Sequence, residues 1–421
     1  MVVVCLVVAL VDQGDINMAN TFKFGNENWA VKDGKVLAYN DENNAFKPLP
    51  FTFARSSSAT RVDNEGLIKS TDSGFARIDF LNNTSGHLLL EPQSTNKVTV
   101  SEDFSNSVWV KSNSTVSLSS ISTPNGDLNS YKLVESDTNS SHHITFGNSS
   151  TSDMSFSVFA KSAERTFVQL QAAGVGNTDC VFDLSNGTIL IEEANATANI
   201  KDYGNGWYRC SVSYSASGTN NSVIKLYNGG DSYQGDGSSG LYIWGAQLEE
   251  LSYPTSYIAT TGSAVTRAAE TCNSAGNSTV FDSTEGVFYA EISALASDST
   301  AKEITLSDGT TNNRIIISYN TANQIRINYR KASSNIFDQT KTITITESNK
   351  VAVKYKLNDF SFFVNGTKVA SSTSGSVMSA NTLTQLNFDD GSGSFDFYGK
   401  IKNVQVYNTA LTDAELIELT S

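Results

Sequence analysis

The sequence has few cysteines, prolines, histidines and charged residues, and each scarcity excludes a class of protein. Four cysteines are scattered over 421 residues without a CxxC pair, so the chain carries neither a disulfide framework nor a zinc site. Charged residues make up only 17%, and 29 basic against 43 acidic side chains give a net charge of −14. Nucleic-acid binders need a basic surface for phosphates, so we expect no nucleic-acid partner.

The sequence also lacks a hydrophobic run long enough to span a bilayer. Its first segment, MVVVCLVVALVDQG, has no basic residue in front, and the apolar part ends at Val11. We therefore expect no membrane insertion. Residues 1–17 are interpreted as a leader or an extension from a wrongly assigned start, because Met18 begins a more ordinary sequence.

Few residues suit catalysis. The histidines are His87, His142 and His143, and no GxSxG motif accompanies them, which argues against a nucleophile triad. A glycosidase needs two carboxyl groups on either side of the bond, and no pattern in the sequence pairs two acidic residues in this way. We expect a protein that is not an enzyme.

Serine, threonine, asparagine and glycine are abundant, and alternating apolar residues recur between turn signals. SFSVFAK places Phe156, Val158 and Ala160 on one face, and QIRINYR does the same with Ile325, Ile327 and Tyr329. Such short strands, with turns about every ten residues, are typical of antiparallel sandwiches. The predicted fold class is all-β, with two antiparallel jelly-roll-like sandwiches after a small irregular N-terminal region.

Turn and cap signals add detail to this prediction. VFDLSNGTILI predicts a strand pair around Asn186-Gly187, and VAVKYKLNDFSFFVNGTKVA (351–370) predicts two hairpins, with turns at Asn358-Asp359 and Asn365-Gly366. In the latter stretch we expect Val351, Val353, Tyr355 and Leu357 to share a face. One short helix is expected in LTDAELIEL, capped by Thr412 and Glu415, with Leu411 against Leu416.

These patterns divide the chain into five parts. The predicted parts are 1–17, the N-terminal attachment region 18–96, a carbohydrate-binding-like sandwich 97–262, a linker 263–280 and a jelly roll 281–421.

Residues 51–70, FTFARSSSATRVDNEGLIKS, place Arg55 and Arg61 at either end of a hydroxyl-rich tract. The tract lacks the GxxxxGK[ST] pattern of a phosphate-binding loop. Its hydroxyls can satisfy backbone groups, and both arginines can pair with carboxylates such as Asp79 or Glu91. We interpret the stretch as a structural hook that holds the N-terminal region to the sandwich or to another chain.

An ordered set of motifs resembles a family of bacteriophage virion proteins, including tail fibres. The set includes ARSSSATRVDNEGLIKS (54–70), HLLLEPQSTNKV (87–98), SEDFSNSVWVK (101–111), GNGWYRCSVSY (204–214) and LYIWGAQLEELSYPTSYIATTG (241–262). The resemblance covers most of residues 51–270. It implies an exposed virion protein whose sandwich is similar to carbohydrate-binding modules.

The C-terminal region resembles a laminin-G or concanavalin-A-like jelly roll. The resemblance rests on KYKLNDFSFFVNGTKVA, followed by FYGKIKNVQVYNTALTDAELIEL. It implies the fold of residues 281–421, and such domains bind sugars or proteins.

Sugar binding needs aromatic faces beside polar side chains. The strongest candidate is the loop 228–240, NGGDSYQGDGSSG, which is long, polar and glycine-rich and carries one aromatic residue. The glycan-binding candidates are Tyr227, Asn228, Asp231, Tyr233, Gln234, Asp236, Tyr242 and Trp244.

No cofactor is expected, with a structural calcium as the one open alternative. Jelly rolls often bind calcium through loop oxygens, and Asp389 and Asp390 in DDGSG are the weak candidates for its ligands.

The favoured function is that of a bacteriophage tail or head fibre that binds host-surface glycans without catalysis. The chain would be made in the host bacterial cytoplasm and reside on the virion surface, in contact with other virion proteins. Single sugar contacts are weak, so repeated copies would raise avidity, and a homo-oligomer, with a trimer favoured, is expected. The alternatives are a purely structural decoration or assembly protein and, less favoured, a polysaccharide depolymerase.

Overall fold

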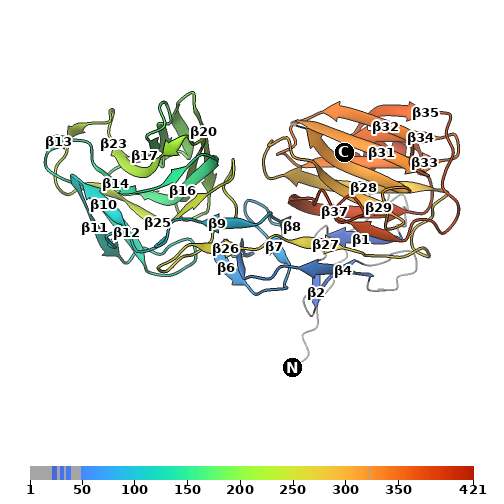
Figure 1. Cartoon of the computed structure of the whole chain (residues 1–421), viewed down its shortest axis with the longest axis horizontal. Coiled ribbons are helices and arrows are strands. Elements are labelled where there is room, and N and C mark those ends of the chain that lie inside the picture. The colour runs from blue at the N-terminus through green and yellow to red at the C-terminus, as the bar shows by residue number, and fades with distance from the viewer. Residues whose placement is uncertain (1–20, 26–28, 33–34, 39–48, 322) are drawn as a thin grey trace, which may run out of the picture.

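The computed structural model describes residues 21–25, 29–32, 35–38, 49–321 and 323–421, and their regular secondary structure is almost entirely β-strand (Figure 1). Two lobes lie side by side, and short strands run beneath both of them in this view. We call these parts the first lobe, the second lobe and the bridging layer. The predicted all-β class with two sandwiches and one C-terminal helix is confirmed. The segment 1–17 and Cys5 lie outside the described residues.

The first lobe is a sandwich of two six-stranded antiparallel sheets. One sheet has the order β10 (Trp109–Ser112), β14 (His143–Phe146), β23 (Asn221–Tyr227), β17 (Phe167–Ala173), β18 (Cys180–Asp183) and β19 (Thr188–Glu192). The other has the order β11 (Ser114–Ser119), β12 (Ser130–Glu135), β25 (Gly240–Glu249), β16 (Asp153–Ser162), β21 (Trp207–Ser215) and β20 (Ala196–Asp202). Two short ribbons pair β13 (Asn139–Ser140) with β24 (Tyr233–Gln234) and β15 (Ser149–Ser150) with β22 (Gly218–Thr219).

The core of the first lobe follows the predicted alternation. Phe156, Val158 and Ala160 point into the core from β16, and β17 contributes its own alternating set. Cys180 and Cys210 are buried free thiols in this core. The predicted turn at Asn186-Gly187 is longer than two residues, since Asp183 pairs with Thr188 and four residues lie between them.

The second lobe packs an eight-stranded sheet against a five-stranded sheet. The larger sheet has the order β35 (Thr367–Ser372), β34 (Phe360–Val364), β33 (Asn349–Lys356), β28 (Glu285–Ala294), β37 (Gly399–Tyr407), β8 (His87–Leu90) and β7 (Arg77–Asp79), and β1 (Phe22–Gly25) also pairs with β37. The smaller sheet has the order β32 (Ser334–Thr342), β31 (Gln324–Lys331), β30 (Arg314–Thr321), β29 (Lys302–Ser307) and β36 (Gln385–Asn387).

The two predicted hairpins of the second lobe are present. Val364 pairs with Thr367 across Asn365-Gly366, both of which have positive φ, as a tight two-residue turn between twisted strands requires. One detail is wrong: Leu357 is 60% exposed, because β33 ends at Lys356 and Leu357 belongs to the turn. The helix α1 (Asp413–Thr420) has the predicted Thr412–Glu415 capping box. Within the described ranges, no helix is long and apolar enough to cross a bilayer.

The bridging layer consists of three small groups of strands. One group has the order β2 (Ala30–Lys32), β3 (Lys35–Ala38), β4 (Leu49–Ala54) and β27 (Thr271–Asn273), a second pairs β26 (Val265–Arg267) with β9 (Ser94–Asn96), and a third pairs β5 (Ala59–Val62) with β6 (Ile68–Thr71). In the first two groups, a strand that precedes the first lobe pairs with a strand that follows it. The bridging layer therefore closes the chain on both sides of the first lobe.

This arrangement differs from the predicted division into an attachment region and a linker. Residues 18–96 contribute β1, β7 and β8 to the large sheet of the second lobe, so they do not form a separate unit. Residues 263–280 form β26 and β27, and Ala275 bridges to Leu386 of the second lobe. Local alternation cannot reveal such pairing, because the partners lie hundreds of residues apart in the chain.

Candidate functional site

The predicted glycan loop, residues 228–240, folds into an ordered polar turn at one end of the first lobe. Tyr233 donates its hydroxyl hydrogen to Oε2 of Glu135 at 2.7 Å, and its ring lies 4.8 Å from the ring of His142. The guanidinium of Arg165 lies 5.5 Å from the centre of the same ring. Burial and the Glu135 carboxylate raise the pKa of Tyr233. The ring of Tyr233 therefore packs against other side chains of the same protein.

Four other candidates in and beside this loop are polar and exposed: Asn228, Asp231, Gln234 and Asp236. Asp236 accepts hydrogen bonds from the backbone N–H groups of Ser238 and Ser239, and the Ser239 hydroxyl and these amides lower its pKa. Tyr227 and Tyr242 are half-buried. The loop therefore offers hydrogen-bonding groups, but no freely exposed aromatic face.

The structure corrects the prediction that Trp244 is a glycan-binding residue. Its side chain is only 1% exposed and packs against Phe159 and Tyr257, with ring centres 5.2 and 4.8 Å away. The outer face of β25 at this point is covered by the bridging layer, since Val62 and Ile68 belong to the same apolar cluster. A sugar cannot stack on this ring.

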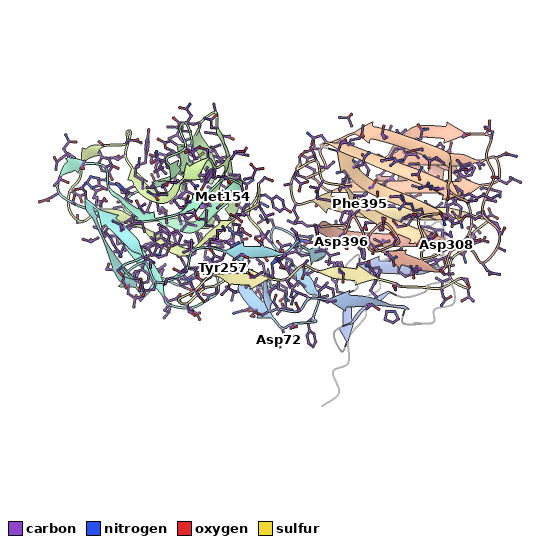
Figure 2. All side chains as sticks on the ribbon, in the orientation of Figure 1. Asp72, Met154, Tyr257, Asp308, Phe395 and Asp396 are labelled. Carbon is purple, nitrogen blue, oxygen red and sulfur yellow. The ribbon has the colours of Figure 1, made fainter. Side chains whose placement is uncertain are left out.

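The loop 389–396, DDGSGSFD, in the second lobe presents an aromatic ring that the sequence reasoning missed. Phe395 is 56% exposed, and its backbone carbonyl accepts a hydrogen bond from the Glu303 N–H at 3.0 Å. Asp396 follows it and accepts a hydrogen bond from the Tyr398 hydroxyl at 3.1 Å. Burial raises the pKa of Asp396. Figure 2 labels Phe395 and Asp396 next to each other on the second lobe.

Phe395 also has a strained backbone, with φ of +56°. A bulky residue in this region is a conformational outlier that costs about 1–2 kcal/mol. Strain of this kind is often kept at functional positions. A signal was available, because this loop and the loop 228–240 are both rich in glycine and serine around one aromatic residue. Sequence alone could not tell which of the two rings is exposed.

The calcium candidates Asp389 and Asp390 lie at the start of the same loop, where both carboxylates accept hydrogen bonds. Asp389 accepts from the Gly391 N–H at 2.6 Å and from the Asn273 amide at 2.7 Å. Asp390 accepts from the N–H groups of Ser392 and Ser394. Among the described residues, Oδ2 of Asp390 accepts only from the Ser392 hydroxyl, at 3.0 Å, so a calcium ion at this loop stays a prediction. Over the described ranges, no group of three or more His, Cys, Asp and Glu side chains is arranged to hold a metal.

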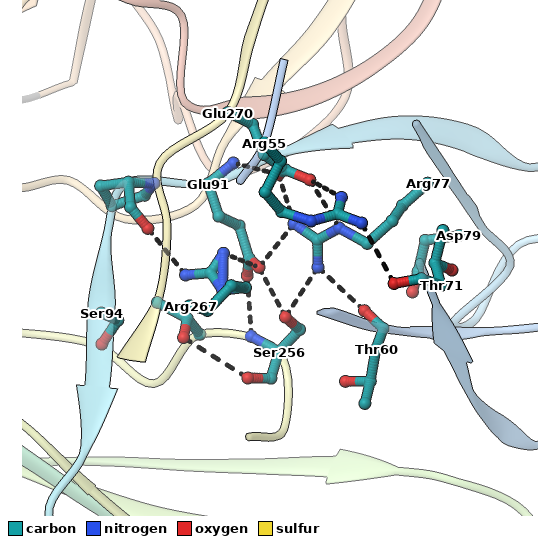
Figure 3. A network of polar contacts seen from close by, with 12 residues as sticks. Arg55, Thr60, Thr71, Arg77, Asp79, Glu91, Ser94, Ser256, Arg267 and Glu270 are labelled. Atoms are coloured by element: carbon teal, nitrogen blue, oxygen red, sulfur yellow. Dashed lines mark hydrogen bonds and ion pairs between the residues drawn. The ribbon is translucent and has the colours of Figure 1, made fainter. Parts of the chain in front are cut away.

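Arg55 belongs to a buried ion cluster in the bridging layer, which Figure 3 shows from close by. Arg55 donates to Oε1 of Glu270 at 2.6 Å, and Arg77 binds both oxygens of the same carboxylate. Arg77 also lies 2.9 Å from Glu91, and Arg267 donates to Glu91 at 2.8 Å. The five side chains of this ion cluster are all nearly inaccessible to solvent.

The electrostatics of the ion cluster follow from burial and pairing. Burial opposes the charge of Arg77, yet Glu270 and Glu91 raise its pKa above the ordinary value. Burial would raise the pKa of Glu91, but Arg267 and Arg77 lower it to about 2. For Arg55, which pairs with one carboxylate only, burial dominates and the pKa is lowered.

The hook interpretation of Arg55 and Arg61 therefore needs two corrections. The partner of Arg55 is Glu270, and neither Asp79 nor Glu91 binds it. Arg61 forms a hydrogen bond only with the carbonyl of Ile78, at 3.2 Å, among the contacts of the described residues. Asp79 instead accepts from the backbone N–H groups of Val62 and Leu81. Arg55 thus has the geometry of a hook, whereas Arg61 has a single bond to a neighbouring strand.

The hydroxyl tract between these arginines lines a cavity of about 350 Å³ together with Glu102 and Tyr257. Tyr257 donates to Glu102 at 3.0 Å, and burial raises the pKa of that carboxyl. Thr60 donates to the carbonyl of Tyr257 at 2.6 Å. The tract therefore lies where the bridging layer contacts the first lobe.

Comparison with known proteins supports the fold of the second lobe. Residues 290–417 match the family model of the Concanavalin A-like lectin/glucanases superfamily. The predicted concanavalin-A-like jelly roll is confirmed over this range. No curated protein matches the chain.

Three solved structures illustrate the remaining likenesses. The Ruminococcus gnavus IT-sialidase CBM40 bound to alpha2,3 sialyllactose has 17% identity and a TM-score of 0.30, over 35% of this chain and 94% of that one. Domain 4 of AbnA, an extracellular arabinanase from Geobacillus stearothermophilus, in complex with arabinotriose, has 13% identity and a TM-score of 0.30, over 36% and 73%. Sheep galectin-11 in complex with glycerol has 10% identity and a TM-score of 0.20, over 29% and 86%. Values this low assign no ligand to this chain.

Proposed function

We propose that the protein is a glycan-binding protein of a bacteriophage virion, exposed on the particle surface, without catalytic activity. Its lectin-superfamily match over residues 290–417 supports the glycan-binding part. The phage part is supported by the ordered motifs of residues 51–270. Its partners are host-surface glycans and other virion proteins.

The observation that carries the proposal is the exposed ring of Phe395 beside Asp396. The C–H faces of a sugar ring pack on aromatic faces, and carboxylates accept hydrogen bonds from sugar hydroxyls. The bond from the Glu303 N–H to its carbonyl fixes the backbone at Phe395, so little backbone entropy is lost when a sugar binds. The anchoring bonds of Asp389 and Asp390 fix the loop in the same way.

A single site of this size is weak, and adhesion requires several copies. Linking such sites raises avidity by roughly 10²–10⁴, which favours a homo-oligomer, with a trimer as the preferred state. A purely structural decoration protein is the second candidate, because the buried ion cluster and the bridging layer make the chain a rigid spacer.

A glycan array with the intact protein tests the proposal. The variant Phe395→Asn removes the ring and keeps a residue that tolerates positive φ, and we expect it to weaken binding about tenfold or more. Leu357→Asn is the matched control, because Leu357 is 60% exposed in another turn of the same lobe. Equal binding by both variants would overturn the assignment.

Two further readouts separate the alternatives. Release of shorter saccharides from a bound polysaccharide would identify a depolymerase instead of a binding protein. No binding to any glycan, combined with assembly into particles, would favour the structural role. Because the proposal includes no cofactor, we expect a chelator to leave glycan binding unchanged.

A further inference from the structure

A second, larger cavity lies between the two lobes, and nothing above assigns it a role. Its volume is about 480 Å³. Strands β20 and β21 of the first lobe form one wall, and residues 294–297 with Lys400 of the second lobe form another. The chain segment 252–256 and part of β7–β8 close the third side. We call this cavity the interlobe cleft.

Two lysines from different lobes face the interlobe cleft without a partner. Lys201 lies on β20 and Lys400 on β37, and neither side chain forms a hydrogen bond or an ion pair within the part of the chain that the structure describes. Lys201 is exposed at the rim of the cleft, and desolvation by its neighbours, the charge of Lys400 and the charge of Arg209 lower its pKa to about 8. Both lysines line the same cavity and their like charges oppose each other, in a protein whose net charge is −14.

The other charged groups of the cleft are already engaged. Arg209, paired with Lys201 across the two strands, donates to the Ser157 hydroxyl and to the Thr255 carbonyl. Asp79 accepts from two backbone N–H groups, and Glu91 belongs to the buried ion cluster. The acceptors of Arg209 are neutral, so Arg209 adds to the positive charge of Lys201 and Lys400, and Asp79 offsets it only in part.

The remaining lining is rich in hydrogen-bonding side chains. Thr197 and Asn199 alternate with Lys201 along β20, and Ser213 lies on the neighbouring strand β21. Alternate residues of a strand share a face, so these groups and Lys201 point into the same space. A ligand that carries both an anionic group and several hydroxyls matches this surface.

We propose that the interlobe cleft binds an acidic saccharide, with its carboxylate or sulfate held between Lys201 and Lys400. Its hydroxyls meet Thr197, Asn199 and Ser213. Because the anion bridges one residue from each lobe, binding also fixes the lobes relative to each other. This site is separate from the Phe395 loop and does not depend on it.

Titration calorimetry of the full chain with trigalacturonate, at about pH 6.5 and low salt, tests the proposal. The fully methyl-esterified trisaccharide is the matched ligand, since it keeps the ring shape and loses the charge. We expect the acid to bind and the ester to bind at least about tenfold more weakly. Equal affinities would overturn the proposal, and so would inorganic sulfate binding as tightly as trigalacturonate, because the cleft would then be a simple anion site.

Variants locate the site. Lys201→Gln and Lys400→Gln should each weaken trigalacturonate binding about tenfold, and Lys341→Gln on β32 of the second lobe makes the same charge change as a control. Neither lysine forms a hydrogen bond or an ion pair among the described residues, so both variants should fold normally, which circular dichroism checks. Binding that survives both substitutions would overturn the assignment.

Two further measurements complete the test. Binding should weaken as pH rises from about 6.5 to 9, because Lys201 loses its proton near pH 8 beside Lys400, Arg209, Asp79 and Glu91. Unchanged affinity over this range would contradict a role for Lys201. The variant Phe395→Asn should leave trigalacturonate binding intact, so a failure of the proposed Phe395 site and a failure of the interlobe cleft give different results.

Discussion

Arg55 and Glu270 lie 215 residues apart in the sequence, yet Nη1 of Arg55 donates to Oε1 of Glu270 over 2.6 Å, out of reach of solvent. One partner precedes the first lobe and the other follows it, so the pair closes the chain around that lobe. A buried ion pair adds little net stability by itself, but loss of one partner leaves an unpaired buried charge. The pair therefore acts as a structural requirement of the bridging layer.

The first prediction compares the two arginines of the hydroxyl tract. We expect Arg55→Ala to lower the free energy of unfolding by about 1.5–3 kcal/mol, because Glu270 loses one charge-assisted hydrogen bond and keeps those from Arg77. Arg61→Ala should cost less than about 1 kcal/mol, since Arg61 is half-buried and donates to one carbonyl. Urea denaturation measures both values. Similar losses for the two variants would remove the special role of Arg55.

The second prediction concerns acid stability. Burial would raise the pKa of Glu91, but Arg267 and Arg77 lower it from 4.5 to about 2 in the folded protein. A lowered folded-state pKa stabilises the protein above pH 4.5, and this contribution is lost as pH falls from there towards 2. We expect a loss of about 3 kcal/mol over this window.

The variant Glu91→Gln isolates this effect. Its free energy of unfolding should be lower than that of the wild type at neutral pH, and its dependence on pH below 4.5 should be shallower. Glu65→Gln, in an exposed turn, serves as the control and should keep the wild-type slope. An unchanged slope in Glu91→Gln would mean that other carboxyl groups set the acid limit.

The third prediction tests whether the N-terminal strands belong to the second lobe. Phe51 on β4 is fully buried, and its ring lies 5.1 Å from that of Phe24 and 5.2 Å from that of Phe388. We expect Phe51→Ala to destabilise the second lobe by about 3–5 kcal/mol. Phe75→Ala removes a ring that is 43% exposed and should cost far less. Calorimetric scans in which only a separate, early transition changed would instead support an independent N-terminal unit.

The strands could be predicted from the sequence because alternation and turn preferences depend only on neighbouring residues. Ile325, Ile327 and Tyr329 are all fully buried, as their spacing indicated, and the Asn365-Gly366 turn follows from backbone preferences of two residues. Trp244 shows where this reasoning ends. On β25, Leu241 and Ile243 face the core of the first lobe, whereas Trp244 is covered by the bridging layer. A local pattern contains no information about this packing of the bridging layer on β25.

The functional loops show the same limit. Both glycine-rich loops carry one aromatic residue, and the prediction chose the longer one. The ring of Tyr233 is occupied by His142, Arg165 and Glu135, which come from distant parts of the chain. The exposure of Phe395 likewise depends on tertiary structure, through the bond between its carbonyl and Glu303. Composition identifies a loop, whereas availability of its side chains is a property of the packed molecule.

The last prediction separates these two loops by experiment. Tyr233→Phe removes the hydroxyl that donates to Glu135 and keeps the ring, so it should cost about 1–2 kcal/mol of stability and leave glycan binding unchanged. Phe395→Asn should do the reverse: binding weakens, while stability holds or rises because a strained residue is replaced by one that tolerates positive φ. Denaturation and glycan binding measured on the same preparations give both numbers. If Tyr233→Phe weakened binding at unchanged stability, the glycan site would lie in the loop 228–240 of the first lobe, and Phe395 would be an exposed ring without that function.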